Sequence, residues 1–247
     1  MATPYAMRHL SEVGSTQDEA ARLLSGTGES ALLLYADRQV GGRGRSGREW
    51  WEADRGMYAS MAMRPEWEPS TWPRLSLVAG LAARNAAHEV FEVSTDLKWP
   101  NDLVVPTGKV GGVLAEAGSD TVVVGCGMNV WWPDAPDGAA ALQAVDPGAV
   151  VVRRLVVAWA DRLVGRLERG ADEWGREEYR SACVTLGQDI MWDTDGAGTA
   201  VDIAADGGLV VETARGRIVI RSGEVRRVRD ATVTRDDQPG GEGAAAP

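Results

Sequence analysis

Hydrophobic and polar positions alternate along the chain with two different periods, which predict an ordered series of helices and strands. In the segment 73–90 the apolar side chains recur every three or four residues and line one side of a helix: Leu75, Val78, Ala79, Ala82 and Ala86. Helices are also predicted over 150–167 and 172–183. Apolar runs at 31–35 and 122–124 are typical of buried strands, and strands are also predicted over 56–63, 97–105 and 109–117.

Turn and capping residues set the limits of these elements. Thr16 and Glu19 have the spacing of a capping box, which predicts that a helix starts there and continues through 20–24. The triplet Pro-Thr-Gly at 106–108 joins the strands 97–105 and 109–117. The triplet Gly-Cys-Gly at 125–127 is expected to end the strand 122–124.

The pattern changes near residue 186. Five short strands punctuated by glycines follow, at 188–192, 199–203, 209–213, 218–220 and 225–228, and they predict a small β-barrel. We therefore expect one domain over 1–185 and a second over 186–232. The remaining residues, 233–247, are expected to form a disordered tail.

Composition narrows the class of protein. The 247 residues are 44% hydrophobic and 25% charged, as in an ordinary globular chain. A net charge of −10 argues against nucleic-acid binding by charge alone, so no DNA partner is expected. Two distant cysteines, Cys126 and Cys183, favour a reducing, cytoplasmic setting. No apolar run is long enough to span a membrane, and the first ten residues do not resemble a signal peptide.

Several common catalytic motifs are absent. The two histidines, His9 and His88, are not part of an HExxH motif, and there is no C-x-x-C, G-x-S-x-G or Walker A pattern. These absences argue against zinc and serine hydrolases. Residues 42–47 spell G-x-G-x-x-G, but arginines occupy the variable positions and Trp50-Trp51 follow without helical periodicity. A dinucleotide-binding fold is therefore not favoured.

The segment 38–48 carries the most suggestive chemistry, with four arginines and four glycines in eleven residues. Arginine donors suit phosphate oxygens, and glycine permits the backbone angles of a mobile loop. Composition alone leaves an anion site and a solvated loop equally open. Lys109, beside the predicted turn 106–108, could reach a carboxylate or a phosphate, although a lysine in such a position is more often only solvated.

Four segments, in this order, resemble the motifs of the biotin protein ligase family. They are GSTQDEA at 14–20, QVGGRGRSGREW at 39–50, LKWPND at 97–102, and KVGGVL at 109–114 followed by GCGMN at 125–129. The resemblance is strong over about residues 8–185 and weaker over 186–230. It implies an α+β fold, with a class II synthetase-like catalytic domain of mixed sheet and flanking helices, and a small C-terminal SH3-like barrel.

The resemblance also implies a reaction. An enzyme of this family activates biotin with ATP as biotinyl-5′-AMP, releases pyrophosphate, and passes biotin to a lysine of a biotin carboxyl carrier protein or domain of an acyl-CoA carboxylase. Mg²⁺ is implied mainly through the ATP phosphates, and no protein ligand for it is assigned. Closure of the arginine loop would shield the mixed anhydride from water.

Individual residues take roles from the same resemblance. Biotin would be bound by Ser15, Thr16, Gln39, Gly42, Arg43, Lys109, Gly112 and Gly125. The adenylate would be bound by Arg43, Arg45, Arg48, Trp50, Asn101 and Asn129. The implied catalytic residues are Lys109, Arg45 and Asp102.

Physical arguments support some of these roles and leave others open. A cation such as Lys109 would offset the repulsion between the two reacting anions, and Asp102 would orient the carrier lysine. Simpler structural readings also stand: helix capping for Ser15 and Thr16, core packing for Trp50, and a turn carboxylate for Asp102.

The sequence departs from the family pattern at two points, and two alternative functions remain open. Ser46 stands where some relatives have another arginine, and the first motif begins so near residue 1 that no DNA-binding domain is expected before it. A lipoate or octanoate ligase of the same fold is the nearest alternative function. A non-catalytic nucleic-acid module is the other, disfavoured by the net charge and by the lack of aromatics within the arginine loop. A monomer and a weak homodimer are both compatible with the sequence.

Overall fold

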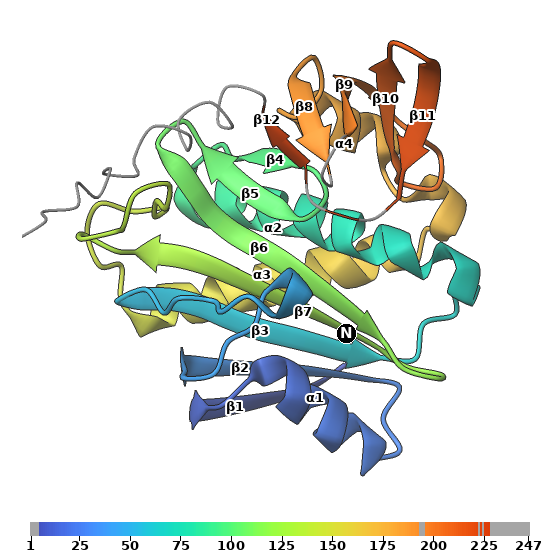
Figure 1. The fold of residues 1–247 in the computed structure, drawn as a ribbon. Coiled ribbons are helices and arrows are strands. Elements are labelled where there is room, and N and C mark those ends of the chain that lie inside the picture. Colours follow the sequence, from blue (N-terminus) through green and yellow to red (C-terminus); the bar gives the residue numbers. More distant parts are fainter. Residues whose placement is uncertain (1–4, 193–195, 222, 224, 228–247) are drawn as a thin grey trace, which may run out of the picture.

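The computed structural model describes residues 5–192, 196–221, 223 and 225–227. A large mixed sheet carries helices on both faces, and a smaller sheet lies beside it (Figure 1). The expected α+β architecture is therefore confirmed.

Seven strands form the large sheet in the order β1-β2-β3-β7-β6-β5-β4. The neighbours β1 and β2 are parallel, and the other neighbouring pairs are antiparallel. The strands are β1 Ala6–Val13, β2 Ala31–Gln39, β3 Arg55–Met63, β4 Asp96–Lys98, β5 Asp102–Val105, β6 Gly108–Ala117 and β7 Val122–Trp131.

The helices divide between the two faces of this sheet. On one face α1 (Thr16–Ser25) packs Ala20 and Leu24 against apolar side chains of β2, β3 and β7. On the other face lie α2 (Leu75–Phe91) and α3 (Ala149–Leu167), followed by the shorter α4 (Arg176–Ala182). Three short 3-10 turns complete the set: η1 Arg45–Gly47, η2 Pro69–Arg74 and η3 Ala171–Glu173.

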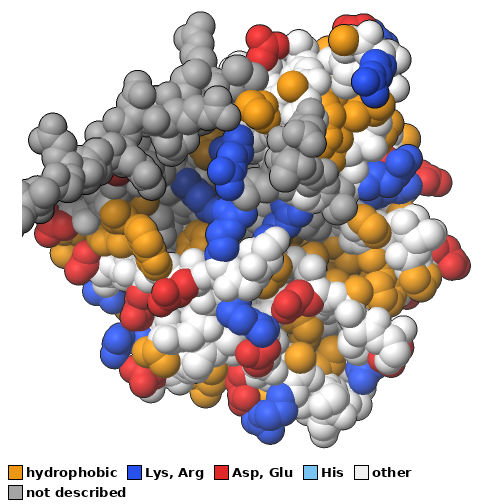
Figure 2. Space-filling view, in the orientation of Figure 1, with side chains coloured by type: hydrophobic (Ala, Val, Ile, Leu, Met, Phe, Trp, Pro, Cys, Tyr) orange, Lys and Arg blue, Asp and Glu red, His pale blue; other side chains and the backbone are white. Residues whose placement is uncertain are grey.

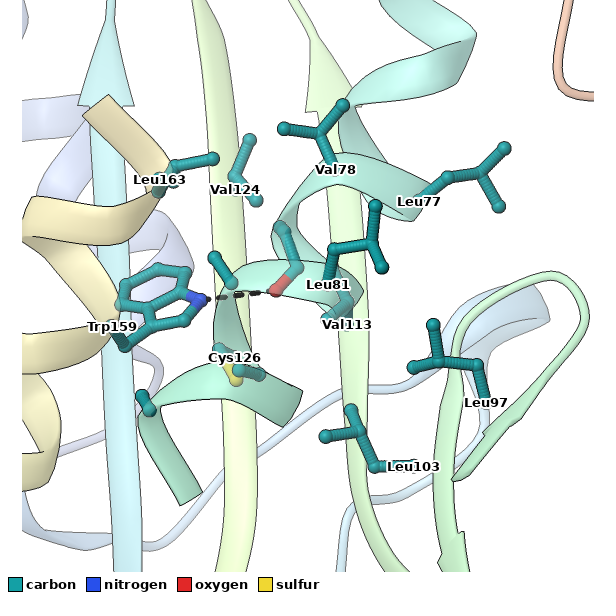
Figure 3. Close-up of a cluster of buried hydrophobic side chains, with 14 of the residues drawn as sticks. Leu77, Val78, Leu81, Leu97, Leu103, Val113, Val124, Cys126, Trp159 and Leu163 are labelled. Atoms are coloured by element: carbon teal, nitrogen blue, oxygen red, sulfur yellow. Dashed lines mark hydrogen bonds between the residues drawn. The ribbon is translucent and has the colours of Figure 1, made fainter. Parts of the chain in front are cut away.

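The larger hydrophobic core lies between the sheet and the pair α2 and α3. Small alanines along α2 let the two helices pack closely, as the spacing of its apolar residues predicted. Trp159 of α3 is fully buried, and its indole N–H donates to the Ala79 carbonyl of α2 at 3.3 Å. Figure 3 shows this contact beside Leu81, Val124 and Cys126. This core covers one face of the large sheet, and the cavity described below lies on the opposite face.

The smaller sheet is antiparallel, in the order β11-β10-β9-β8-β12. Its strands are β8 Asp189–Trp192, β9 Gly196–Ile203, β10 Leu209–Thr213, β11 Gly216–Ile220 and β12 Val225–Arg227. They agree with the five predicted strands and with the expected SH3-like unit, although residue 228 and the predicted tail 233–247 lie outside the described residues. The domain limit at 186 stays a prediction.

The turn between β9 and β10 attaches the smaller sheet to the larger unit. The indole N–H of Trp174 donates to the Ala205 carbonyl at 3.1 Å, and that of Trp99 donates to the Gly207 carbonyl at 3.0 Å. Arg176 of α4 donates to the Ile203 carbonyl at 2.6 Å. Because Trp99 stands in the turn between β4 and β5, the two sheets meet at that turn.

Three predicted elements need correction. The segment 97–105 is not one strand but the hairpin β4–β5, whose turn is Trp99–Asn101 with a cis Trp99–Pro100 bond. The strand from Val122 does not end at 125–127 but continues to Trp131, because those residues pair with β3 and β6 on both sides. The helix predicted over 172–183 is η3 and α4, separated at Gly175, which has a φ of +96°.

Two further features of the N-terminal region differ from expectation. The strand β1 was not predicted, because it is an edge strand whose exposed positions carry no apolar alternation. The capping box does not form. Ser15 is the N-cap of α1 and makes no side-chain capping bond, while the Thr16 side chain turns toward Gln39. No helix among the described residues is long and apolar enough to cross a membrane.

Candidate active site

A cavity of about 270 Å³ opens at the junction of α1, the segment 39–50, the β4–β5 turn and β12. Figure 2 shows Lys and Arg side chains gathered near the middle of the face on which these parts meet. In the described part of the chain, five cationic side chains line the cavity (Arg43, Arg45, Arg48, Lys98 and Lys109), against two acidic ones (Glu49 and Asp102). The cavity is thus locally cationic in a chain whose net charge is −10.

Glycines of β6 and β7 make room on the cavity floor. Gly112 pairs with Gly127, so two neighbouring strands lack side chains at one level. The indole of Trp50 lies over both: an added Cβ would come within 3.0 Å of its Cζ3 at Gly112 and within 2.8 Å of its Cε2 at Gly127. Gly127, which was expected to end a strand, thus belongs to a continuous strand and leaves space for the Trp50 indole.

An uncharged polar cluster forms one end of the cavity. Gln39 Oε1 accepts hydrogen bonds from the backbone N–H and the hydroxyl of Thr16, each at 2.8 Å. Ser60 Oγ donates to Thr16 Oγ1 at 2.9 Å and lies 3.2 Å from Gln17 Oε1. Ser15 is 8% exposed at the start of α1. Hydroxyl and amide groups of this kind can hold a small polar ring that carries no charge.

A lysine and a carboxylate form the opposite, charged part of the cavity. Lys109 Nζ lies 2.6 Å from Asp102 Oδ1 and 5.3 Å from the centroid of the Trp50 ring. The backbone of Lys109 is held on both sides, because its N–H donates to Gly138 and its carbonyl accepts from Ala140, each at 2.8 Å. The position of this cation is therefore set by the strand and by the loop beside it.

The arginines of the loop connect three parts of the molecule. Arg45 donates to Asn101 Oδ1 in the β4–β5 turn and to the Gly223 carbonyl beside β12, each at 3.2 Å. Arg43 pairs with Asp18 of α1 at 2.5 Å and with Glu116 of β6 at 3.6 Å. Gly223, beside β12 of the smaller sheet, therefore contacts the arginine loop that lines the cavity.

Most of the predicted site residues meet at this cavity. Its lining includes Ser15, Thr16, Gln39, Arg43, Arg45, Arg48, Trp50, Asn101, Asp102, Lys109, Gly112 and Gly125.

Two predicted site residues do not line it. Gly42 is buried behind the lining, where its carbonyl accepts from the Trp50 N–H at 2.9 Å. Asn129 is 4% exposed, and its amide donates to the Ala140 carbonyl at 3.0 Å and to that of Lys109 at 3.4 Å. A direct nucleotide contact by Asn129 remains a prediction, whereas these contacts brace Lys109.

Sequence reasoning missed several residues of the lining. Gln17 and Ser60 stand at the polar end, and Lys98, Gly223 and Val225 stand near the loop. A buried glutamine or serine has no spacing signal of its own. The position of Gln17, directly after Ser15-Thr16 in the first motif, was the available hint.

Burial limits the reactive groups in the cavity. It raises the pKa of the Cys126 thiol and, together with smaller effects, the pKa of the Tyr58 phenol. Both groups therefore stay protonated at neutral pH, and Cys126 is not a thiolate nucleophile. The described residues contain no cluster of three or more His, Cys, Asp or Glu side chains that could hold a metal ion. The five cationic side chains that line the cavity are suited to binding an anion.

Comparison with known proteins gives consistent matches. Residues 12–129 match the Biotin/lipoate A/B protein ligase family, and 196–227 match the Biotin protein ligase C terminal domain. A biotin–[acetyl-CoA-carboxylase] ligase of Mycobacterium tuberculosis is 33% identical over 242 residues, covering 89% of this chain and 88% of its own length.

Solved structures agree in fold over most of the chain. The biotin protein ligase of Aquifex aeolicus in complex with biotin and ATP matches with a TM-score of 0.75 at 31% identity, over 90% of this chain and 99% of that one. The enzyme of Leishmania major in complex with biotinyl-5-AMP matches with a TM-score of 0.63 at 26% identity, over 87% and 98% of the two chains.

Proposed function

The chain belongs to the biotin protein ligase family, and from this premise we infer that it is an ATP-dependent enzyme that makes biotinyl-5′-AMP and transfers biotin to a lysine of a carboxylase. One observation carries the assignment to this cavity: a single space of about 270 Å³ has an uncharged hydrogen-bonding end and a lysine at its other part. Biotin has the same two features, an uncharged ureido ring and a carboxylate.

The proposed orientation of biotin follows from this match. Its ureido ring lies at the polar end against Ser15, Thr16 and Gln39, and its carboxylate points toward Lys109. The floor beneath the fused rings is formed by Gly112 and Gly125, where side chains would take up the space.

In the first step a biotin carboxylate oxygen attacks the α-phosphorus of ATP, and the bond from that phosphorus to the pyrophosphate oxygen breaks. Both reactants are anions, so fixed cations reduce their repulsion and stabilise the charge that develops on the phosphoryl oxygens. Lys109 is held by its backbone at this position, and Arg43, Arg45 and Arg48 line the same cavity. Trp50 and Asn101 complete the proposed adenylate site.

In the second step the neutral amine of a carrier lysine attacks the acyl carbon of the anhydride, and AMP leaves with the electrons of the broken C–O bond. Asp102 is proposed to orient the incoming lysine. Its present partner is Lys109, at 2.6 Å, so the carboxylate already stands where it holds one lysine ammonium. A biotin carboxyl carrier protein or domain is the proposed partner.

The metal requirement is proposed only through the substrate. The described residues provide no cluster of metal-binding side chains, so Mg²⁺ would accompany the ATP phosphates. Cytoplasmic location is likewise proposed, supported by Cys126 and Cys183, which are both free and buried.

Lipoate or octanoate ligation is the alternative of the same fold, since the matching family model includes lipoate ligases. The polar cluster around Thr16, Gln39 and Ser60 favours biotin, because a dithiolane ring or an alkyl chain has no groups that would satisfy it.

Biotin-dependent exchange of labelled pyrophosphate into ATP tests the assignment. We expect exchange with biotin but not with lipoate, and a loss of about 10²–10³-fold in Lys109→Ala, as for removal of one charge-stabilising group. The exposed substitution Arg22→Gln on α1 is the control. Absence of exchange in folded wild-type protein would overturn the function, and full exchange in Lys109→Ala would overturn the role of that lysine.

A further inference from the structure

The polar end of the cavity contains two buried groups that the proposed biotin contacts do not require. Gln17 is 6% exposed in the first turn of α1, and Ser60 is fully buried in β3. Burying an amide and a hydroxyl is unfavourable unless their hydrogen-bonding groups are satisfied. Each of the two side chains should therefore have hydrogen-bond partners inside the protein.

The orientation of the Gln17 amide is fixed by its neighbours. Its nitrogen donates to the Val123 carbonyl of β7 at 2.9 Å and to the Leu114 carbonyl of β6 at 3.3 Å. Carbonyl oxygens only accept, so a flipped amide would face two acceptors with an oxygen. Oε1 must therefore point to Ser60 Oγ, 3.2 Å away.

The Thr16 hydroxyl is fixed in a similar way. Gln39 Oε1 accepts from the backbone N–H of Thr16, which can only donate, so the Gln39 amide is also oriented. The Thr16 hydroxyl donates to the same oxygen, and its lone pairs remain as acceptors. The Ser60 hydroxyl thus has one proton and two acceptors for it, Thr16 Oγ1 at 2.9 Å and Gln17 Oε1 at 3.2 Å.

We propose that Gln17 determines specificity by accepting the hydrogen bond of the Ser60 hydroxyl when biotin binds, which leaves lone pairs of the Thr16 and Ser60 hydroxyls as acceptors for the ureido N–H groups. The inference rests on the proposed function and deepens it. An acid without N–H donors leaves these lone pairs unpaired in a buried site, and such sites reject analogues that lack the matching group. Gln17 is a positioning residue, since it acts through Ser60.

Pyrophosphate exchange with Gln17→Met, Ser60→Ala and the exposed control Arg22→Gln tests this proposal. We expect Gln17→Met to raise the KM for biotin about tenfold, the scale of one lost hydrogen bond, with the KM for ATP and kcat unchanged. Arg22→Gln, on the same helix, should leave all three constants unchanged. Because both groups act on one proton, the double variant should raise the KM by less than the product of the single effects.

Biotin methylated on its ureido nitrogens distinguishes this role from a general packing defect, because a packing defect would not change the ratio of the KM values for the analogue and for biotin. The wild type should discriminate between biotin and this analogue more strongly than either Gln17→Met or Ser60→Ala does. Ser60→Ala keeps the test decisive if Gln17→Met fails to fold. Equal discrimination in all folded variants, or a parallel rise in the KM for ATP, would overturn the role of Gln17. Absence of exchange in the wild type would instead overturn the proposed function.

Discussion

Replacing Gly125 by alanine should damage the protein through one identifiable collision. An added Cβ would stand 2.5 Å from Gln17 Oε1 and 3.3 Å from Ser60 Oγ. Ordinary contact begins near 3.4 Å, so the Gln17 side chain must retreat by roughly 0.9 Å in a close-packed interior. That side chain is held by its bonds to the Val123 and Leu114 carbonyls, and the retreat breaks or stretches both.

The magnitude follows from those bonds. Each neutral hydrogen bond contributes about 0.5–1.5 kcal/mol, so the loss of two lowers the free energy of unfolding by about 1–3 kcal/mol. Overpacking of a core by one methyl group falls in the same range, about 1–3 kcal/mol. For a chain of this size, we expect the melting temperature to fall by roughly 4–8 °C for a 2 kcal/mol loss. The KM for biotin should rise as well, because the displaced groups border the polar end of the cavity.

Urea unfolding of wild type, Gly125→Ala, Gln17→Ala and the double variant measures this effect. With Gln17 truncated, the methyl group of Gly125→Ala has room, so its further cost should fall by about 1 kcal/mol or more. Gly165→Ala is the control, because Gly165 lies in α3 with nothing within 4 Å of an added Cβ. It should be as stable as wild type or about 1 kcal/mol more stable. Additive effects of Gly125→Ala and Gln17→Ala would refute the collision.

Three further substitutions test the core, an ion pair and the second step of the reaction. Trp159→Ala should lower the free energy of unfolding by about 3–5 kcal/mol, measured by urea unfolding, since Trp159 is fully buried between α3 and α2. Burial alone would raise the pKa of Glu178, but hydrogen bonds, led by the one from Arg166, lower it overall. The ionised Glu178 carboxylate therefore stabilises the fold above the ordinary pKa of 4.5, and this stabilisation is lost as the pH falls through the lowered pKa. Glu178→Gln should therefore cost about 1 kcal/mol at pH 7, discounted for the partial exposure of the side chain. In thermal melts the difference from wild type should shrink as the pH falls below 4.5, and a difference independent of pH would exclude this cause. Asp102→Asn should keep the rate of pyrophosphate exchange within about tenfold of wild type. The same variant should slow single-turnover transfer of biotin from biotinyl-5′-AMP to a carrier by about 10²-fold. Equal losses in the two assays would argue against a role of Asp102 with the carrier lysine.

The sequence was most informative where periodicity and motif agreed. The apolar spacing over 73–90 predicted α2, and the helix over 150–167 became α3, because both bury one side against the same core. Lys109, Asp102 and Arg45 were assigned through motifs, and all three line the cavity. Residues from separate motifs come together at one cavity, so motif sequences carry spatial information that composition lacks.

Local sequence rules failed where tertiary contacts overrode them. The glycines at 125 and 127 were expected to end a strand, yet β3 and β6 pair on either side of them, and their missing side chains make room for Gln17 and Trp50. Thr16 looked like a capping residue, but its hydroxyl is used by Gln39 instead. The edge strand β1 lacks an apolar alternation because half of its residues are exposed and none is fully buried. In each case the deciding partner is distant in sequence.

The pairing of β3 with β7 joins two parts of the chain that lie far apart in sequence, with Met63 opposite Val122. Such a pairing closes a long loop and brings the entropic cost of non-local contacts, so we expect it to form late in folding. The cavity spans this seam, because Thr16 and Gln39 come from one side and Lys109 and Gly125 from the other. In the proposed orientation of biotin, neither half alone would contact both ends of the molecule. A chain in which β3 and β7 have not paired would lack part of the proposed site, so we expect the reactive acyl-adenylate only from molecules in which this pairing has formed.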